Sequence, residues 1–371
     1  MTYLLSEEQR AVKATFAAFV DKEVRPVAAQ LDREPRFPQE LFERVGQLGF
    51  FGMRYATEEA EKAGAISYLL AVEELARGSL AVAAACTMQS LMGTYFVSRF
   101  GDTELKERLF YPALEGKVIG AICMTEPNAG SDLLSMKSRA EERAGQWRVS
   151  GQKTWVTSAP VADMFTVFAK TGEKELSIFL VEKGAEGLQI GRNIDKMGVR
   201  ASLTSEVAFE EAPATLLGER GAGLEGLLEV LVEIRVMTAA LAIGVAQAAF
   251  EEALAYSKER SQFGKPICKY QAVQAHLAEM ATDLQAARAL THSVALRAEA
   301  GENVATEAAM AKLFSSEAAL GVCDRAARVL ASYGFAKDYA VERYLRDVRF
   351  TLIGGGTSEI LRNNIGRALT Q

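Results

Sequence analysis

One loop in the chain combines polar groups that suit a bound ring or phosphate. Residues 124–132 (MTEPNAGSD) leave an apolar stretch and enter a turn rich in glycine and asparagine. Such a loop presents backbone N–H groups and hydroxyls beside a sheet edge, where a flat heteroaromatic ring or a phosphate can bind. An ordinary strand-to-loop turn has a similar composition, so this segment alone leaves both interpretations open.

Three other segments carry residues that could contact a flat ring or a phosphate. Residues 151–157 (GQKTWVT) place a tryptophan on a half-buried strand, where an indole can be a flat wall but is more often part of a core. Residues 256–267 (YSKERSQFGKPI) end a helical pattern with an arginine and a phenylalanine. Residues 354–359 (GGGTSE) form a glycine loop in which Thr357 or Ser358 can cap a following helix.

Several other chemistries are excluded by composition. The net charge of −6 and pI near 5.4 argue against nucleic acid as a partner, which requires a basic face. The two histidines, His276 and His292, lie in a helical pattern, which argues against a Ser-His-Asp site or a histidine metal site. The most apolar region, residues 69–92, carries three charges, so we expect no membrane insertion. The four cysteines are far apart without a C-x-x-C pair, so we expect buried thiols and no metal: Cys86, Cys123, Cys268 and Cys323.

The periodicity of apolar residues changes twice along the chain. It predicts an α+β protein with an N-terminal helical domain (1–117), a central antiparallel β-barrel or sandwich (118–215) and a C-terminal four-helix bundle (216–371). The predicted strands are 118–124, 147–149, 153–157, 164–169, 176–181 and 206–209, and the predicted bundle helices are 224–260, 270–299, 304–332 and 337–350.

The four segments, in this order, resemble the acyl-CoA dehydrogenase superfamily. MTEPNAGSD is similar to its first signature, GQKTWVT to its G-x-K-x-W-I-T strand, and YSKERSQFGKPI to its Y-x-x-x-R-x-x-F-G-K segment. Residues 343–369 resemble its closing segment, in which an arginine-rich helix runs into an E-G-T-x-E-I turn. The resemblance covers essentially the whole chain. It implies a cytoplasmic FAD-dependent oxidoreductase that acts on an acyl thioester and assembles as a homotetramer.

The same resemblance implies which residues bind FAD and substrate. Arg260 and Arg328 would approach the diphosphate of FAD bound to a neighbouring subunit, and Phe263 would pack on that cofactor. Ala331 and Ser332 stand where the family has glycines after Arg328, and their side chains leave less space for this segment to approach the diphosphate. The implied cofactor residues are Met124, Thr125, Ser131, Trp155, Thr157, Arg260, Phe263, Arg328, Thr357 and Glu359, and the implied substrate residues are Ser131, Arg235 and Gly355.

The resemblance fails at the catalytic base. The family places a base either in the closing turn, where this chain has Gly355, or just before a helical arginine, where it has Ile234. Glu233 is a weak candidate because one helical residue rotates a side chain by about 100°, and Glu229 is weaker. The catalytic residue is therefore unknown. We expect Gly355 to leave room for a side chain.

Three functions remain open from the sequence. The first is α,β-dehydrogenation of an acyl thioester, carried on CoA or an acyl carrier protein, with a non-standard base. The second is a flavin-dependent oxygenase or elimination enzyme, desulfinase-like or decarboxylase-like, which needs no α-proton abstraction. The third is a non-catalytic assembly subunit. The electron acceptor is either an electron-transfer flavoprotein or oxygen.

Overall fold

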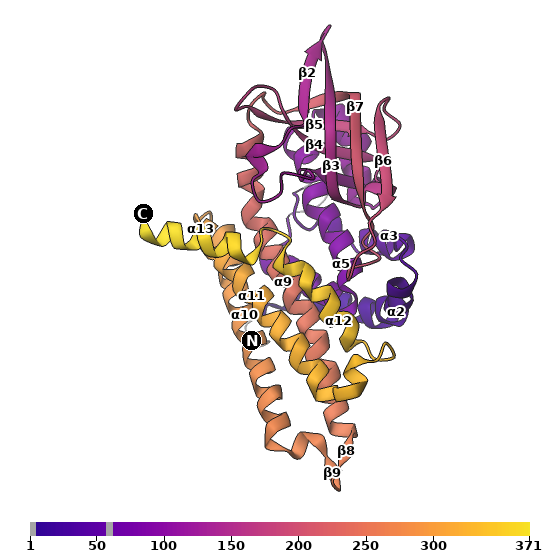
Figure 1. Ribbon diagram of the computed structural model, residues 1–371, viewed down its shortest axis with the longest axis vertical. Helices are drawn as coiled ribbons and strands as arrows, with labels where there is room; N and C mark the ends of the chain where they lie inside the picture. Colours follow the sequence, from indigo (N-terminus) through magenta and orange to yellow (C-terminus); the bar gives the residue numbers. More distant parts are fainter. Residues whose placement is uncertain (1–4, 57–61) are drawn as a thin grey trace.

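The computed structural model describes residues 5–56 and 62–371. The chain forms helices, then a β-sheet region, then long helices, as the sequence predicts (Figure 1). The β-region lies at one end of the molecule, and the long helices extend to the other end.

The N-terminal helices pack into one apolar core. The long apolar stretch Leu80–Phe100 would suffice to cross a membrane by length and composition, but 89% of its apolar window is buried inside the protein. It is therefore a core helix, and π-helical segments at Val20–Val24, Met88–Gly93 and Lys106–Phe110 interrupt this region. The helices are α1 Glu7–Phe19, α2 Arg25–Arg33, α3 Gln39–Gln47, α4 Ala65–Gly78, α5 Leu80–Thr87, α6 Tyr95–Phe100, α7 Thr103–Leu105 and α8 Tyr111–Leu114.

The central region is a closed sheet of mixed direction. The pairings β4–β2–β3–β7–β5–β4 complete a ring, which makes the sheet a barrel. The predicted barrel is confirmed, but its sheet is mixed rather than antiparallel: β1 runs parallel to β4 with Gly120 opposite Met164, and β2 meets β4 in parallel at Arg139 and Lys170. The strands are β1 Gly120–Cys123, β2 Arg139–Arg143, β3 Gln146–Thr157, β4 Met164–Lys170, β5 Leu176–Glu182, β6 Leu188–Asn193 and β7 Thr204–Leu217.

The C-terminal helices form a bundle around α9 (Gly223–Glu259). Gly244 lets α9 approach α4, because a Cβ at this position would lie 2.3 Å from the carbonyl oxygen of Glu73. The predicted fourth helix is shorter than expected, and a further helix, α13, projects from the bundle (Figure 1). The remaining elements are the hairpin β8 Ser261–Gln262 and β9 Lys265–Pro266, and the helices α10 Gln271–Glu299, α11 Ala305–Leu330, α12 Val341–Asp347 and α13 Ser358–Thr370.

Candidate functional site

A buried ion pair joins two of the predicted segments. The Nζ of Lys153 on β3 lies 2.9 Å from Oε1 of Glu126 and donates to the carbonyl oxygen of Met124 at 3.2 Å. The amide of Thr154 also donates to the carbonyl oxygen of Thr125 at 2.9 Å. The loop after β1 and the strand with the tryptophan therefore form one unit.

The carboxylate of Glu126 is ionised at neutral pH. Burial alone would raise the pKa of Glu126, but the amides of Lys137 and Ser138 donate to its carboxylate, and with Lys153 they lower that pKa to about 2. Burial lowers the pKa of Lys153, and the carboxylate of Glu126 opposes this shift. Removing either partner would leave the other buried and without its counter-charge.

Trp155 lies beside this unit with much of its ring uncovered. It occupies a register shift of β3 against β7, at a φ of 58°, and is 58% exposed. A large residue at positive φ is a strained conformation of the kind that concentrates at binding sites. Thr157 follows on the same strand, opposite Thr204, and Ser131 is exposed in the preceding loop. A flat ring system would cover the indole.

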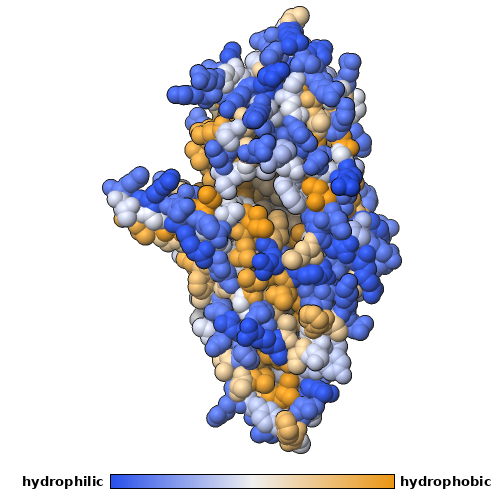
Figure 2. Space-filling view, viewed as in Figure 1, coloured by the Kyte–Doolittle hydropathy of each residue, from blue (hydrophilic) through white to orange (hydrophobic). Residues whose placement is uncertain are grey.

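Apolar residues surround a hollow between the β-region and the helices on the face shown in Figure 2. Three large apolar side chains in or beside the predicted site segments are exposed. Trp155 lies in the segment 151–157, Leu134 follows the loop 124–132, and Ile353 precedes the glycine turn 354–359. Uncovered apolar surface of this kind marks a binding site.

The second group of predicted cofactor residues lies far from Trp155. Arg260 and Phe263 adjoin the β8–β9 hairpin at the opposite end of the molecule from the β-region (Figure 1). They line a groove of about 460 Å³ with Tyr333, over which the Arg260 guanidinium lies at 5.8 Å. Phe263 is 95% exposed, and Arg328 pairs with Asp324. A single chain therefore carries two separate halves of the predicted cofactor site.

The glycine turn before α13 brings the remaining predicted residues together. Thr357 caps α13 by accepting from the amide of Ile360 at 3.3 Å. Glu359 is exposed on the first turn, and hydrogen bonds from its own amide and from Thr357 lower its pKa. Lys312 is fully buried and donates to the carbonyl oxygen of Gly356 at 2.6 Å. These contacts fix the turn on which Gly355 lies.

The two family base positions face each other. A Cβ built at Gly355 would lie 3.4 Å from Cγ2 of Ile234 and 3.2 Å from Oγ1 of Thr238, which donates to the carbonyl oxygen of Ile234. Neither position carries an acid. The expectation of free room at Gly355 is wrong, because its φ of 72° and these close contacts constrain any side chain there.

The weak candidate bases are engaged elsewhere. Glu233 forms an ion pair with Arg54, whose side chain is only 8% exposed. Glu229 accepts from the hydroxyl of Tyr95 at 3.1 Å. Arg54 was missed by sequence reasoning, since it belongs to no motif and only the fold brings it to α9.

Arg235 is buried within the bundle. It donates to the carbonyl oxygen of Ala305 at 3.2 Å, and its Nε has no hydrogen-bond partner in the part of the chain that the structure describes. Burial lowers the pKa of the neighbouring Lys312 to about 8, with a further contribution from the charge of Arg235. The role of Arg235 toward substrate stays a prediction.

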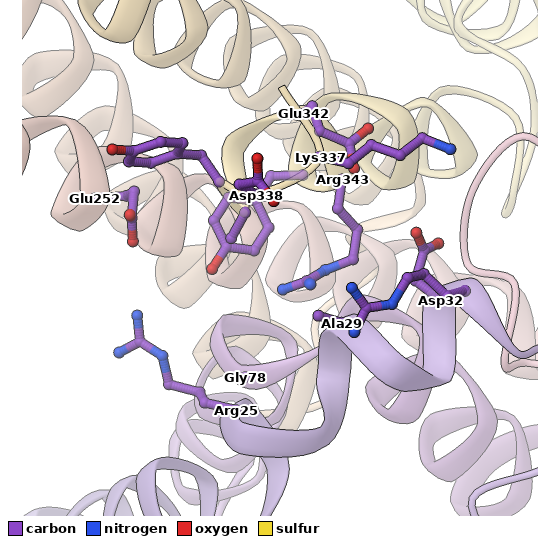
Figure 3. Close-up of a pocket in the computed structure, with 13 residues that line it drawn as sticks. Arg25, Ala29, Asp32, Gly78, Glu252, Lys337, Asp338, Glu342 and Arg343 are labelled. Carbon is purple, nitrogen blue, oxygen red and sulfur yellow. The ribbon is translucent and has the colours of Figure 1, made fainter. Parts of the chain in front are cut away.

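The two arginines of α12, Arg343 and Arg346, have different surroundings. Arg346 pairs with Asp32 and Glu342 at 2.6 and 2.8 Å, which ties α12 to α2. Arg343 points into a cavity of about 220 Å³ between these helices (Figure 3). The charges around this cavity are balanced between cations and carboxylates: Arg25, Arg33, Lys337 and Arg343 against Asp32, Glu252, Asp338 and Glu342.

Comparison with known proteins gives matches along nearly the whole chain. The family models for the acyl-CoA dehydrogenase N-terminal, middle and C-terminal domains match residues 6–117, 121–212 and 221–370. The chain is 54% identical to benzylmalonyl-CoA dehydrogenase of Aromatoleum aromaticum, over 100% of both chains.

Solved structures agree with these matches. Butyryl-CoA dehydrogenase from Megasphaera elsdenii is 32% identical, with a TM-score of 0.95 over 99% of both chains. A structure of PigA with FAD and proline is 27% identical, with a TM-score of 0.95 over 100% of this chain and 99% of that one.

Proposed function

The chain belongs to the acyl-CoA dehydrogenase family, and from this premise we propose that its substrate is an acyl-CoA with a carboxylate on the α-carbon. The reaction type is α,β-dehydrogenation of an acyl thioester. The observation that carries the proposal is the pair Gly355 and Ile234, which face each other without an acid at either family base position. The similarity to benzylmalonyl-CoA dehydrogenase supports both the carboxylate and an aryl group on the β-carbon.

An α-carboxylate removes the need for a base. Dehydrogenation requires an electron pair on the α-carbon before the β-hydrogen leaves as hydride, and a positioned base normally supplies about 10²- to 10⁴-fold in rate. Loss of CO₂ leaves the same electron pair behind. The side chain of Ile234 and the bare Gly355 leave no acid at the place of the family base, so the electron pair comes from the bond to the departing carboxylate.

The bonds balance without removal of a proton from carbon. The bond from the α-carbon to the carboxylate breaks, its electron pair passes into the thioester as an enolate, and CO₂ leaves. The β-carbon then loses its hydrogen with both electrons, and an α,β-unsaturated thioester remains. Bound FAD supplies the hydride acceptor for this chemistry.

We propose that FAD binds noncovalently across two subunits. The uncovered indole of Trp155 and the polar loop held by the Glu126–Lys153 pair fit a flat ring. Thr125, Thr157 and Thr357 would contact the ring and ribityl chain. Arg260 and Arg328 would bind the diphosphate from the neighbouring subunit, because the β8–β9 hairpin that follows Arg260 lies at the opposite end of the chain's fold from β3, which carries Trp155 (Figure 1).

The protein is expected to be a homotetramer. Phe263 and Phe335 are 95% and 92% exposed at the end of the bundle that carries the second cofactor group, and apolar side chains this exposed favour burial by another subunit. Light scattering at micromolar concentration should give about four times the chain mass of 40.2 kDa. A monomer that still binds FAD tightly would contradict both the assembly and the shared cofactor site.

A matched pair of substrates tests the proposed function. The purified protein should be yellow, and 2-benzylmalonyl-CoA should bleach its flavin at least about 10² times faster than 3-phenylpropanoyl-CoA, because only the first can form the enolate without a base. The two thioesters differ only in the α-carboxylate. Equal rates would show that a base is in place and would refute the proposal.

The oxygenase, the desulfinase-like enzyme and the non-catalytic subunit are not favoured by benzylmalonyl-CoA dehydrogenase and butyryl-CoA dehydrogenase, which are named as thioester dehydrogenases. The proposed dehydrogenation keeps from the decarboxylase-like alternative only the departure of CO₂. Because the chain is similar to benzylmalonyl-CoA dehydrogenase, we propose that the acyl group is carried on CoA rather than on an acyl carrier protein. The electron acceptor, an electron-transfer flavoprotein or oxygen, and the cytoplasmic location stay predictions.

A further inference from the structure

We propose that Arg54 recognises the α-carboxylate of the substrate and that Glu233 is its displaceable counter-ion in the free enzyme. This inference rests on the proposed function, since it assigns a residue to the carboxylate that the function requires. Arg54 lies in the segment that follows α3, Glu233 lies on α9, and the two side chains form an ion pair.

Arg54 is held in place independently of Glu233. Its guanidinium donates to the carbonyl oxygen of Ser90 at 3.2 Å. It also lies over the rings of Tyr55 and Tyr68, at 5.6 and 5.9 Å from their centres. With only 8% of its side chain exposed, the guanidinium is fixed before any ligand arrives, so little further entropy is lost on binding.

Glu233 is held much less firmly. Its side chain is 45% exposed, and Arg54 is the one hydrogen-bonding or ionic partner found for it among the described residues. Its half-exposed carboxylate can reach water, but the buried guanidinium of Arg54 then keeps a counter-charge only if another carboxylate takes its place. The carboxylate of a ligand can take its place on a guanidinium that cannot itself move away.

The position of the pair suits the proposed substrate. Glu233 directly precedes Ile234 on α9, and the Cα atoms of consecutive residues are about 3.8 Å apart. A Cβ built at Gly355 would lie 3.4 Å from Cγ2 of Ile234. One helical residue rotates a side chain by about 100°, so Glu233 and Ile234 leave adjacent faces of α9. A carboxylate on an α-carbon beside Gly355 therefore has to extend past Ile234 to meet Arg54.

Two other buried cations near this turn are committed to the backbone. Arg235 donates to the carbonyl oxygen of Ala305, and Lys312 to that of Gly356. Within residues 5–56 and 62–371, neither forms a salt bridge with a carboxylate, whereas Arg54 pairs with Glu233. A carboxylate of the substrate can replace that of Glu233 because the two have the same chemistry.

The test uses two ligands that differ only in the carboxylate. Malonyl-CoA carries it and acetyl-CoA does not, and neither has a β-carbon from which hydride could leave. Their affinities are measured by perturbation of the flavin spectrum in the FAD-loaded protein. The wild type should prefer malonyl-CoA. Arg54→Met should weaken malonyl-CoA binding at least about tenfold, and Glu233→Gln should tighten it about two- to fivefold. Acetyl-CoA binding should change in neither variant.

The decisive result is that the two variants change the affinity for malonyl-CoA in opposite directions. A merely structural ion pair would make both variants weaken malonyl-CoA binding, or leave the ratio of the two affinities unchanged, and either outcome would overturn the inference. Arg54→Lys, which keeps the charge, should retain part of the preference and serves if Arg54→Met fails to fold. A preference that survives in every variant refutes only the role of Arg54. A wild type without any preference would count against the proposed function itself.

Discussion

Replacing Gly355 by glutamate is expected to reverse the substrate preference of the enzyme. The new carboxylate faces Ile234 at the family base position, so it can remove the α-proton of 3-phenylpropanoyl-CoA and accelerate flavin reduction by about 10²-fold or more. The same carboxylate repels the α-carboxylate of 2-benzylmalonyl-CoA and occupies its space, so that activity should fall sharply. Stopped-flow reduction of the flavin by both thioesters measures the change.

The substitution also has a structural cost. Gly355 has a φ of 72°, which costs a residue with a Cβ about 1–2 kcal/mol. Gly355→Gln is the matched control, because it carries the same strain and nearly the same volume without a base. It should lose activity on the carboxylated thioester and gain none on the other. Equal behaviour of the Glu and Gln variants would show that the missing base does not set the specificity.

Removing the ammonium of Lys153 is expected to cost the protein much of its stability and its flavin. Lys153→Met leaves the buried carboxylate of Glu126 without its counter-charge, which typically costs about 3–5 kcal/mol. The loop 124–132 and the strand with Trp155 then lose the ion pair between them and keep the backbone hydrogen bond from Thr154 to Thr125. Denaturant unfolding and the fraction of bound FAD measure the two effects.

The chain offers a matched control for this variant. The Nζ of Lys183 lies 3.1 Å from Oδ1 of Asp163, close to the 2.9 Å of the Lys153–Glu126 pair, but the side chain of Lys183 is 59% exposed. Lys183→Met should therefore cost below about 1 kcal/mol. The double variant Lys153→Met/Glu126→Gln should recover part of the loss, because no charge stays buried alone. If the Lys153 and Lys183 variants are equally stable, the buried pair is not what holds the loop.

Local patterns in the sequence predict most of the fold. The helical period persists through α9, α10 and α11, and the predicted ranges differ from the observed ends by one or two residues. Strands β2 and β6 were missed because their sequences, RAEER and LQIGRN, are polar and largely exposed. They are strands because neighbours pair with them, β3 in the first case and β7 in the second, and no local signal encodes that pairing.

For the site as well, local segments could be predicted from the sequence, whereas contacts between distant segments could not. The segments around Thr125, Trp155 and Arg260 could be identified from their spacing and order. The ion pairs Glu126–Lys153 and Arg54–Glu233 could not, because each joins residues far apart in sequence that only the tertiary fold brings together. Periodicity likewise cannot show that Trp155 is uncovered, since its exposure follows from a register shift against β7.

The most direct measurement of the central claim is the carbon balance of one turnover. The FAD-loaded enzyme is mixed with 2-benzylmalonyl-CoA labelled with ¹³C in the free carboxylate, and the products are analysed by mass spectrometry. The account predicts one ¹³CO₂ for each flavin reduced and an unlabelled α,β-unsaturated thioester that has lost the carboxylate and kept its α-hydrogen. A reduced flavin together with a product that keeps the labelled carboxylate and has lost its α-hydrogen would contradict it, because a base would then have done what we assign to the departure of CO₂.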